Sequence, residues 1–385
     1  MPHLEHIGLA TADPEAVAAL YEMLLGVQPY KRERVDREGV QTHFISAGST
    51  KLELLEALSP DSPVARYLEK RGEGLHHLAF EVDDIHAHMA TLREKGFTPL
   101  SDEPKPGADG KLIFFLHPKQ THGVLVEFCQ SVATPLVPTQ IPYQDEHLTV
   151  YERGHTANPT LVVLHGAAGA TLLETAPLIA HLEQLFHVLA LDFAGHGASG
   201  ALAEQPFSIP FFADNVRALF DAFDLDKAHL FGFSMGGSVA LQFAFDHPER
   251  IAHLAIHAAN LVWDERLVRR MNARLQAEAI NQKYPSLATH LDAAHGDWEH
   301  LFARLQQMVR TLPEHLNLLD QLAQVPHPTL VSAMDQDDLF SLDAPLALHR
   351  ALPNSTLAIL PGTRHAFADV DPALYHRLLV QHFKP

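Results

Sequence analysis

The sequence predicts an α+β unit over residues 1–130, followed by an α/β unit with a helical lid over residues 147–385. Length is the first reason, because the chain has 385 residues and one hydrophobic core usually serves about 100–200 residues. The second reason is a strand–helix–strand pattern that occurs twice before residue 130. The third is a regular alternation of apolar strands and helices after residue 146, which is typical of a parallel sheet.

Composition and charge limit the kind of partner that the chain can have. Hydrophobic residues make up 46% of the sequence and charged residues 19%, which suits a globular protein. The formal net charge of −19 would repel a polyanion over most of the surface, so we expect no nucleic-acid partner. The single cysteine, Cys129, excludes an intrachain disulfide. Because the sequence shows neither a signal peptide nor an apolar run of about 20 residues, it predicts a cytoplasmic protein without a membrane partner.

The first unit is predicted to contain two βαβββ modules. His6 opens the segment HIGLATADPEAVAALYEMLLG and His77 opens HLAFEVDDIHAHMATLREKG, and each segment reads as strand, acidic turn and helix. Each half then ends in strands, with Glu53 in KLELLEAL and Glu127 in GVLVEFC. The histidine and the glutamate have nearly the same spacing in both halves, which indicates a duplicated unit.

These four side chains form a candidate metal site. Strand residues alternate between two faces, so we expect His6 to share its face with Leu4 and Gly8. Glu53 and Glu127 lie within apolar strands, where a carboxylate is costly unless it is paired or coordinated. If the two halves pack face to face, the two imidazoles and two carboxylates meet at one point. Such donors suit a divalent cation such as cobalt, nickel, zinc or manganese, with room left for water or substrate.

The first unit resembles the vicinal-oxygen-chelate (glyoxalase) superfamily and, within it, the methylmalonyl-CoA epimerase family. The likeness covers the whole unit and rests on the segments LEHIGLA, TKLELLEALSPDSPVARYLEKRGEGLHHLAFEVDDI and DEPKPGADGKLIFFLHPKQTHGVLVEF. It implies that His6, Glu53, His77 and Glu127 hold the metal, although some relatives have glutamine as the second ligand. It also implies epimerisation of an alpha-substituted acyl-CoA, and a homodimer, because relatives of this unit are commonly dimers.

Epimerisation removes the proton alpha to a thioester carbonyl and returns a proton to the opposite face. The cation polarises the carbonyl oxygen as a Lewis acid, which stabilises the charge that develops. Some relatives carry a glutamate where this sequence has Thr42, so the identity of the base stays open. Either Glu53 or Glu127 leaves the metal shell to act as the base, or a water molecule relays the proton.

Residues 131–146 predict a linker between the units. Pro135, Pro138 and Pro142 fall within this segment, which shows neither helical nor strand periodicity. After it, six short apolar runs predict the parallel strands of the second unit: PTLVVLHG, FHVLALDFAG, AHLFGFS, IAHLAIHAA, PTLVSAMD and STLAILPG. Residues 261–325 interrupt this alternation with helix-rich sequence, and we expect them to form a lid over the strand ends.

Ser234 is the candidate nucleophile of the second unit. It lies in a G-x-S-x-G motif between the strand AHLFGF and the helix SVALQFAFDHPER, which is the strand–turn–helix context that the motif requires. Gly232 and Gly236 remove side chains that would collide across the sharp turn, so that the hydroxyl group is exposed.

The order Ser, Asp, His expected for this fold supplies the partners of the nucleophile. His365 follows the strand STLAILPG and would accept the serine proton. Asp337 follows the strand PTLVSAMD and would orient the imidazole, with Asp335 and Asp338 as competing neighbours. Backbone amides are the expected oxyanion donors, one from Met235 and one from Ala167.

From about residue 139 onward the chain resembles the α/β-hydrolase family, on G-x-S-x-G together with HGAAG and DFAGHGASG. The likeness implies a serine hydrolase that acts on an ester or a thioester. Together the two resemblances indicate a bifunctional enzyme. Three alternatives stay open: a glyoxalase domain with an esterase, an iron dioxygenase domain with a carbon–carbon-bond hydrolase, and a metal domain that only binds a ligand for the hydrolase.

Overall fold

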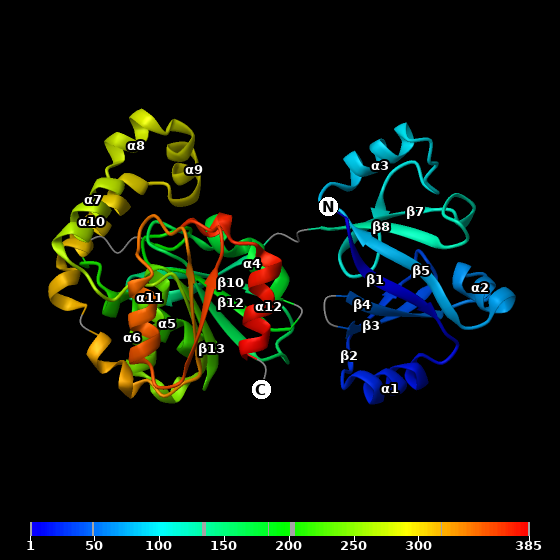
Figure 1. Cartoon of the computed structure of the whole chain (residues 1–385), viewed down its shortest axis with the longest axis horizontal. Helices are drawn as coiled ribbons and strands as arrows, with labels where there is room; N and C mark the ends of the chain where they lie inside the picture. The colour runs from blue at the N-terminus through cyan, green and yellow to red at the C-terminus, as the bar shows by residue number, and fades with distance from the viewer. Residues whose placement is uncertain are drawn as a thin grey trace. The chain divides into compact units, whose positions relative to one another are not determined.

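The computed structural model describes residues 2–47, 50–132, 136–183, 185–200, 205–316 and 318–383. The chain forms two compact units, Met1–Pro135 and Leu136–Pro385 (Figure 1). Each unit has its own sheet and its own hydrophobic clusters. None of the helices in the described ranges has the length and apolar character needed to cross a bilayer.

Unit 1 consists of two βαβββ motifs joined by helix α2 (Pro63–Arg71), as the sequence predicts. The first motif contains β1 (His3–Ala10), α1 (Pro14–Leu25), β2 (Pro29–Val35), β3 (Val40–Ala47) and β4 (Thr50–Ala57). The second motif contains β5 (Gly74–Glu81), α3 (Ile85–Glu94), β6 (Lys105–Pro106), β7 (Lys111–Leu116), the short helix η1 (Pro118–Gln120) and β8 (Leu125–Ser131).

The two motifs join edge to edge in one eight-stranded sheet, so the expectation that they pack face to face is wrong. The strand order is β2-β3-β4-β1-β5-β8-β7-β6. Strands β1 and β5 run antiparallel at the centre, and each pairs in parallel with the last strand of its own motif, β4 or β8. Because the order repeats outward from this central pair, the four strands that carry the predicted metal ligands are direct neighbours.

Unit 2 has a second eight-stranded sheet, in the order β16-β15-β14-β13-β11-β12-β10-β9. All six predicted parallel strands are present: β11 (Thr160–Leu164), β12 (His187–Asp192), β13 (Ala228–Phe233), β14 (Ile251–His257), β15 (Thr329–Met334) and β16 (Ser355–Leu360). Strand β15 is buried along its whole length, as expected for a parallel strand that is covered on both faces.

Helices cover both faces of this sheet. On one face α5 (Ile209–Ala222), α6 (Met235–Asp246) and α11 (Asp343–Ala351) share a core, and on the other α4 (Ala176–Leu182) packs with α12 (Pro372–Phe383). The insertion between β14 and β15 is helical and gathers beside the sheet in Figure 1: α7 (Glu265–Arg274), α8 (Ala277–Lys283), α9 (Pro285–His295), α10 (Trp298–His315) and η4 (Leu319–Gln324). The remaining short helices are η2 (Thr171–Thr175), η3 (Pro248–Arg250) and η5 (Phe367–Asp369).

The linker predicted over residues 131–146 is wrong in its second half. Pro138–Tyr143 forms β9, which pairs antiparallel with β10 (Glu146–Arg153). Strand β9 is the last strand of the sheet, and an edge strand tolerates proline because one side of it needs no ladder hydrogen bonds. Pro138 and Pro142, which suggested irregular structure, therefore mark the edge of the sheet, and Pro135 lies outside the described residues.

Candidate active sites

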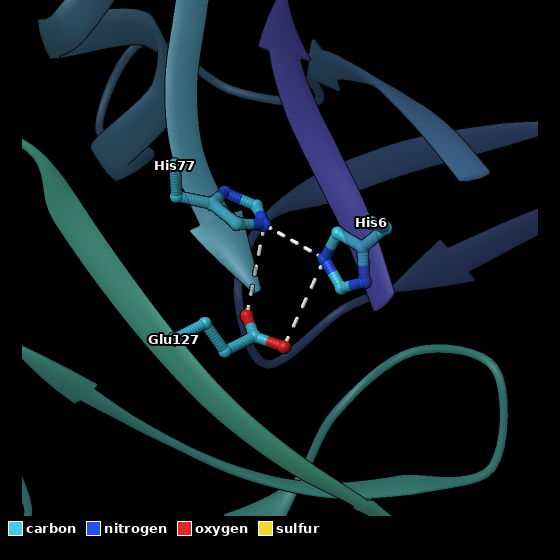
Figure 2. Close-up of side chains that lie close together, drawn as sticks. All are labelled: His6, His77 and Glu127. Carbon is cyan, nitrogen blue, oxygen red and sulfur yellow. Dashed lines mark hydrogen bonds and ion pairs between the residues drawn. The ribbon is translucent and has the colours of Figure 1, made fainter. Parts of the chain in front are cut away.

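The four predicted metal ligands converge in unit 1 from four neighbouring strands. The Nε2 atoms of His6 (β1) and His77 (β5) lie 2.8 Å apart, and Oε2 of Glu53 (β4) lies 3.4 Å from each of them. The carboxylate of Glu127 (β8) lies 3.8 Å from His6 Nε2 and 3.7 Å from His77 Nε2. Figure 2 shows His6, His77 and Glu127 pointing toward one another. All four residues are buried.

The register of the central strands explains this convergence. Gly8 is paired with Glu53 on one side and with His77 on the other, while Ala79 is paired with His6 and with Glu127. Each small residue thus lies between a histidine and a glutamate. A Cβ atom on Gly8 would lie 2.2 Å from Cε1 of His77, so only glycine leaves room for that imidazole.

Glu5 is a buried residue of this site that the strand pattern does not predict. The register of β1 against β5 shifts between Leu4 and His6, which makes Glu5 the extra residue of a β-bulge. The bulge turns Glu5 toward His6, and its Oε2 lies 2.5 Å from His6 Nδ1. Its Oε1 contacts the ammonium groups of Lys51 at 2.7 Å and Lys111 at 3.3 Å.

The electrostatics of the cluster favour a charged imidazole at His6. Burial opposes that charge, but hydrogen bonds to Glu5 and Glu53 raise the pKa of His6 to about 10. Burial also opposes ionisation of Glu53, yet the hydrogen bonds from His6 and His77 hold its pKa well below the usual range. For Glu127 burial outweighs the nearby imidazoles and raises its pKa. The imidazoles therefore do not fully compensate the burial of Glu127.

The donor set fits a divalent cation. Metal–ligand bonds of about 2.1 Å place neighbouring ligand atoms roughly 3 Å apart. The two imidazole nitrogens lie 2.8 Å apart, and each lies 3.4 to 3.8 Å from an oxygen of Glu53 or Glu127. The cluster opens into a pocket of about 650 Å³ that is partly open to solvent and is also lined by Glu38, Thr42 and His76. Thr42 brings a hydroxyl group and no carboxylate to this pocket, and that hydroxyl donates to the Glu33 carbonyl oxygen.

His365 lies within hydrogen-bonding distance of both Ser234 and Asp337 in unit 2. His365 Nε2 lies 3.1 Å from Ser234 Oγ, and His365 Nδ1 lies 2.8 Å from Asp337 Oδ2. The other carboxylates of this loop have different partners: Asp335 accepts from the Thr363 amide, and Asp338 pairs with Arg274. The structure therefore brings Asp337 to the imidazole and directs Asp335 and Asp338 elsewhere.

The backbone around Ser234 has the sharp turn that the motif predicts. Ser234 has φ 52° and ψ −114°, a left-handed conformation that is rare for a residue with a side chain. A Cβ atom on Gly232 would lie 2.3 Å from the Gly236 carbonyl oxygen, and one on Gly236 would lie 2.5 Å from the His165 carbonyl oxygen. Both glycines are therefore required by close backbone contacts.

Asp337 is prepared to orient the imidazole as an anion. Burial opposes its ionisation, but the hydrogen bond from His365 and the amides of Phe340 and Leu339 lower the pKa of Asp337. Oδ1 accepts those two amides at 2.9 and 2.7 Å, which leaves Oδ2 for His365. The Phe233 and Phe340 rings pack against the His365 ring at centroid distances of 5.4 and 5.2 Å.

The two predicted oxyanion donors are Met235, which directly follows the nucleophile, and Ala167, which follows β11. Met235 is the first residue of α6, where an amide has no acceptor within the helix. Ala167 lies in a turn closed by a 3.2 Å hydrogen bond from the Gly169 amide to the Gly166 carbonyl oxygen. The Gly166 amide donates to Oε2 of Glu174 on η2 at 2.9 Å. Burial raises the pKa of Glu174 to about 7.

Two family models match the chain, one in each unit. Residues 5–115 match the glyoxalase/bleomycin resistance protein/dioxygenase superfamily. Residues 159–372 match the alpha/beta hydrolase fold.

Unit 1 is similar to proteins named as epimerases. It is 43% identical over 129 residues to the mitochondrial methylmalonyl-CoA epimerase of Homo sapiens, a match that covers 33% of this chain and 73% of that protein. It is 44% identical over 129 residues to the ethylmalonyl-CoA/methylmalonyl-CoA epimerase of Cereibacter sphaeroides, a match that covers 33% of this chain and 96% of that protein.

Unit 2 has the fold of a solved hydrolase. Its structure matches the 2-hydroxy-6-oxo-6-phenylhexa-2,4-dienoate hydrolase of Rhodococcus sp. strain RHA1 with a TM-score of 0.55 and 22% sequence identity. The match covers 65% of this chain and 99% of that protein. At this identity the likeness shows the shared fold.

Glu5→Gln is expected to weaken binding of Co²⁺ by about 10–100-fold, because a carboxylate on Nδ1 fixes the tautomer and raises the basicity of a coordinating imidazole. Isothermal titration calorimetry of the full chain with Co²⁺ measures this affinity. Glu81→Gln is the matched control, because Glu81 also pairs with Lys111 but contacts neither His6 nor His77 in any interaction described above. Equal Co²⁺ affinity in the two variants would contradict the role of Glu5.

Glu174→Gln is expected to stabilise unit 2 at high pH. The pKa of Glu174 is raised from 4.5 to about 7, so the folded state disfavours the ionised carboxyl, and the resulting cost appears as pH rises from about 4.5 through 7. Glutamine keeps an acceptor for the Gly166 amide and cannot ionise. We expect a gain of about 1–2 kcal/mol in unfolding free energy at pH 8 and little change at pH 5.

Urea unfolding of the wild type and the variant at pH 5 and pH 8 measures this difference. The exposed Glu249 of the same unit, changed to glutamine, controls for the loss of a negative charge. A Glu174→Gln effect that is the same at both pH values would show that Glu174 does not titrate as described.

Proposed function

We propose a bifunctional enzyme on the premise that this chain belongs to two families, through unit 1 to the glyoxalase/bleomycin resistance protein/dioxygenase superfamily and through unit 2 to the alpha/beta hydrolase fold family. Unit 1 epimerises an alpha-substituted acyl-CoA of the methylmalonyl-CoA kind. Unit 2 hydrolyses an ester or a thioester with a serine nucleophile. The named substrates of the similar epimerases support the first assignment.

The meeting of His6, Glu53, His77 and Glu127 at one pocket is the observation that carries the first activity. A divalent cation bound by these residues would act as a Lewis acid toward a thioester carbonyl oxygen. Two carboxylates contact the imidazoles, whereas the ring-cleaving alternative needs two histidines and only one glutamate. The four-donor set therefore favours epimerisation over the dioxygenase reading.

Glu53 and Glu127 are the candidates for proton transfer. Both are buried and both line the pocket that would receive the acyl group. Removal of the alpha proton needs a carboxylate within hydrogen-bonding reach of the carbon, and its return on the opposite face needs a second group. The two glutamates come from β4 and β8, on opposite sides of the central pair β1 and β5, an arrangement that suits one acid or base on each face.

In unit 2, His365 Nε2 would take the proton from Ser234 Oγ as the oxygen attacks the carbonyl carbon of an ester. The Asp337 carboxylate would accept the hydrogen bond from His365 Nδ1, which orients the ring and stabilises the imidazolium that forms. The amides of Ala167 and Met235 would receive the negative charge that develops on the carbonyl oxygen. The hydrogen bond of Ser234 Oγ with His365 Nε2 and that of His365 Nδ1 with Asp337 support these roles.

The covalent link between the two sites motivates a common acyl-CoA substrate. Under this hypothesis unit 1 inverts the alpha carbon and unit 2 cleaves the thioester, which releases free CoA. Incubation of the full chain with methylmalonyl-CoA in D₂O reads both steps at once, as deuterium at the alpha carbon and as free CoA. Deuterium incorporation without release of free CoA would show that unit 2 does not cleave this thioester, and its substrate would then be another ester.

Reciprocal variants test whether the sites act independently. Ser234→Ala is expected to abolish hydrolysis of p-nitrophenyl acetate, with a loss of at least about 10³-fold, and to leave alpha-proton exchange at the wild-type rate. His77→Ala is expected to abolish exchange and to leave ester hydrolysis unchanged, because the pocket loses a donor of its cation.

Two results would contradict this account. Loss of both activities in either variant would show that the two sites are not separate. Wild-type binding of methylmalonyl-CoA without any deuterium exchange would make unit 1 a binding module.

A further inference from the structure

The turn that carries the predicted oxyanion donor Ala167 contains a strained residue. Ala168 has φ 59°, in the left-handed region that glycine adopts freely and that a residue with a Cβ atom adopts only when its surroundings hold it there. The Gly169 amide closes the turn on the Gly166 carbonyl oxygen. Contacts from outside the turn must therefore maintain the position of Ala168.

Glu174 supplies the first of these contacts. Its Oε2 accepts the Gly166 amide at 2.9 Å, and a Cβ atom on Gly169 would lie 2.2 Å from the same oxygen. Gly169 is thus the residue that lets the carboxyl group approach the turn. Since Glu174 follows the turn closely in sequence, this contact holds the turn against its own chain segment and does not involve the helical insertion.

His295 supplies the second contact, and it comes from the insertion. It is the last residue of α9, its Nδ1 accepts the Gly197 amide at 2.9 Å, and its Nε2 donates to the Ala168 carbonyl oxygen at 3.1 Å. Only the neutral tautomer with its proton on Nε2 can make both hydrogen bonds. One imidazole thus joins α9 to the turn at Ala168 and to the loop at Gly197.

We propose that His295 is a positioning residue for the hydrolase, and that the helical insertion aims the Ala167 amide at the oxyanion by holding the Ala168 carbonyl group through this ring. The inference rests on the proposed serine-hydrolase function of unit 2. It gives the insertion a role in transition-state stabilisation, beyond the lid that the sequence predicts. The carbonyl group of Ala168 and the amide of Ala167 are separated by one peptide unit of the same hydrogen-bonded turn, so holding the first restricts the positions that the second can take.

The insertion also contacts the loop of the catalytic acid, which shows that its helices meet the site at more than one point. Arg274 on α7 pairs with Asp338 Oδ2 at 2.7 Å. His295 differs from Arg274, because its Nε2 donates to the HGAAG turn at Ala168. Loss of the His295 ring therefore leaves the Asp338 loop tied to α7, while the turn loses its contact with α9 and keeps its contact with Glu174.

The test uses three substitutions of His295 in the full chain. His295→Leu removes both hydrogen bonds, His295→Gln keeps an amide donor near the position of Nε2, and His295→Asn keeps an acceptor near the position of Nδ1. His290→Leu is the matched control, because His290 is an exposed histidine on the same helix whose Nδ1 bonds only the Ser286 carbonyl oxygen of that helix.

Labelling of wild-type Ser234 by an alkyl fluorophosphonate comes first, and failure of that labelling would overturn the proposed hydrolase together with this inference. Given labelling, kcat and KM are measured with p-nitrophenyl acetate and Kd with phenylboronic acid. Addition of Ser234 Oγ to boron, with its proton passing to His365, gives a tetrahedral anion that needs the oxyanion donors as a transition state does.

His295→Leu is expected to lower kcat by about 10-fold with KM within about 2-fold, and to raise Kd for phenylboronic acid by about the factor lost in kcat. His295→Gln should retain more activity than His295→Asn, because it keeps the donor to Ala168. A His295→Leu enzyme that matches His290→Leu would overturn the inference and leave the proposed function standing. A second result would also overturn the inference: a His295→Leu enzyme with a lower kcat and a lower Tm but an unchanged Kd for phenylboronic acid.

Discussion

The burial of two carboxylates beside two imidazoles is the constraint on which unit 1 depends. Glu53 and Glu127 lie inside the protein, where an unpaired negative charge is very costly. The raised pKa of His6 supplies part of the positive charge, and Glu5, Lys51 and Lys111 extend the network around the two imidazoles. The arrangement of strands serves this convergence, since the antiparallel pair β1 and β5 brings two copies of one motif to a common centre.

Unit 2 places its reactive groups by a different device. Its site lies in loops at the carboxyl ends of parallel strands, and two residues with side chains, Ser234 and Ala168, are held there at positive φ. Such conformations persist where the surrounding contacts outweigh their cost. Close contacts at Gly232 and Gly236 hold Ser234. The turn of Ala168 is held by a hydrogen bond that His295 donates and by one that Glu174 accepts.

The sequence predicts the site residues that occur at equivalent positions of a repeated motif or directly after a strand. It misses the site residues whose position depends on strand register or on contacts between distant segments. Duplicated spacing identifies the four donors of unit 1, and the order of strands leads to Ser234, Asp337 and His365. Glu5 escapes prediction because a bulge breaks the alternation of faces. Strand β9 is not predicted because its prolines lie on the edge strand of the sheet. His295 is not predicted because nothing in a helical segment indicates which distant carbonyl group a histidine will contact.

Anomalous scattering from a crystal of the full chain with Co²⁺, measured at the cobalt edge, tests the central claim most directly. The account predicts a strong peak about 2.0–2.3 Å from the Nε2 atoms of His6 and His77, with carboxylate oxygens of Glu53 and Glu127 in the same shell. Cobalt bound away from the two imidazoles, or a cluster that stays free of cobalt at saturating concentration, would contradict it.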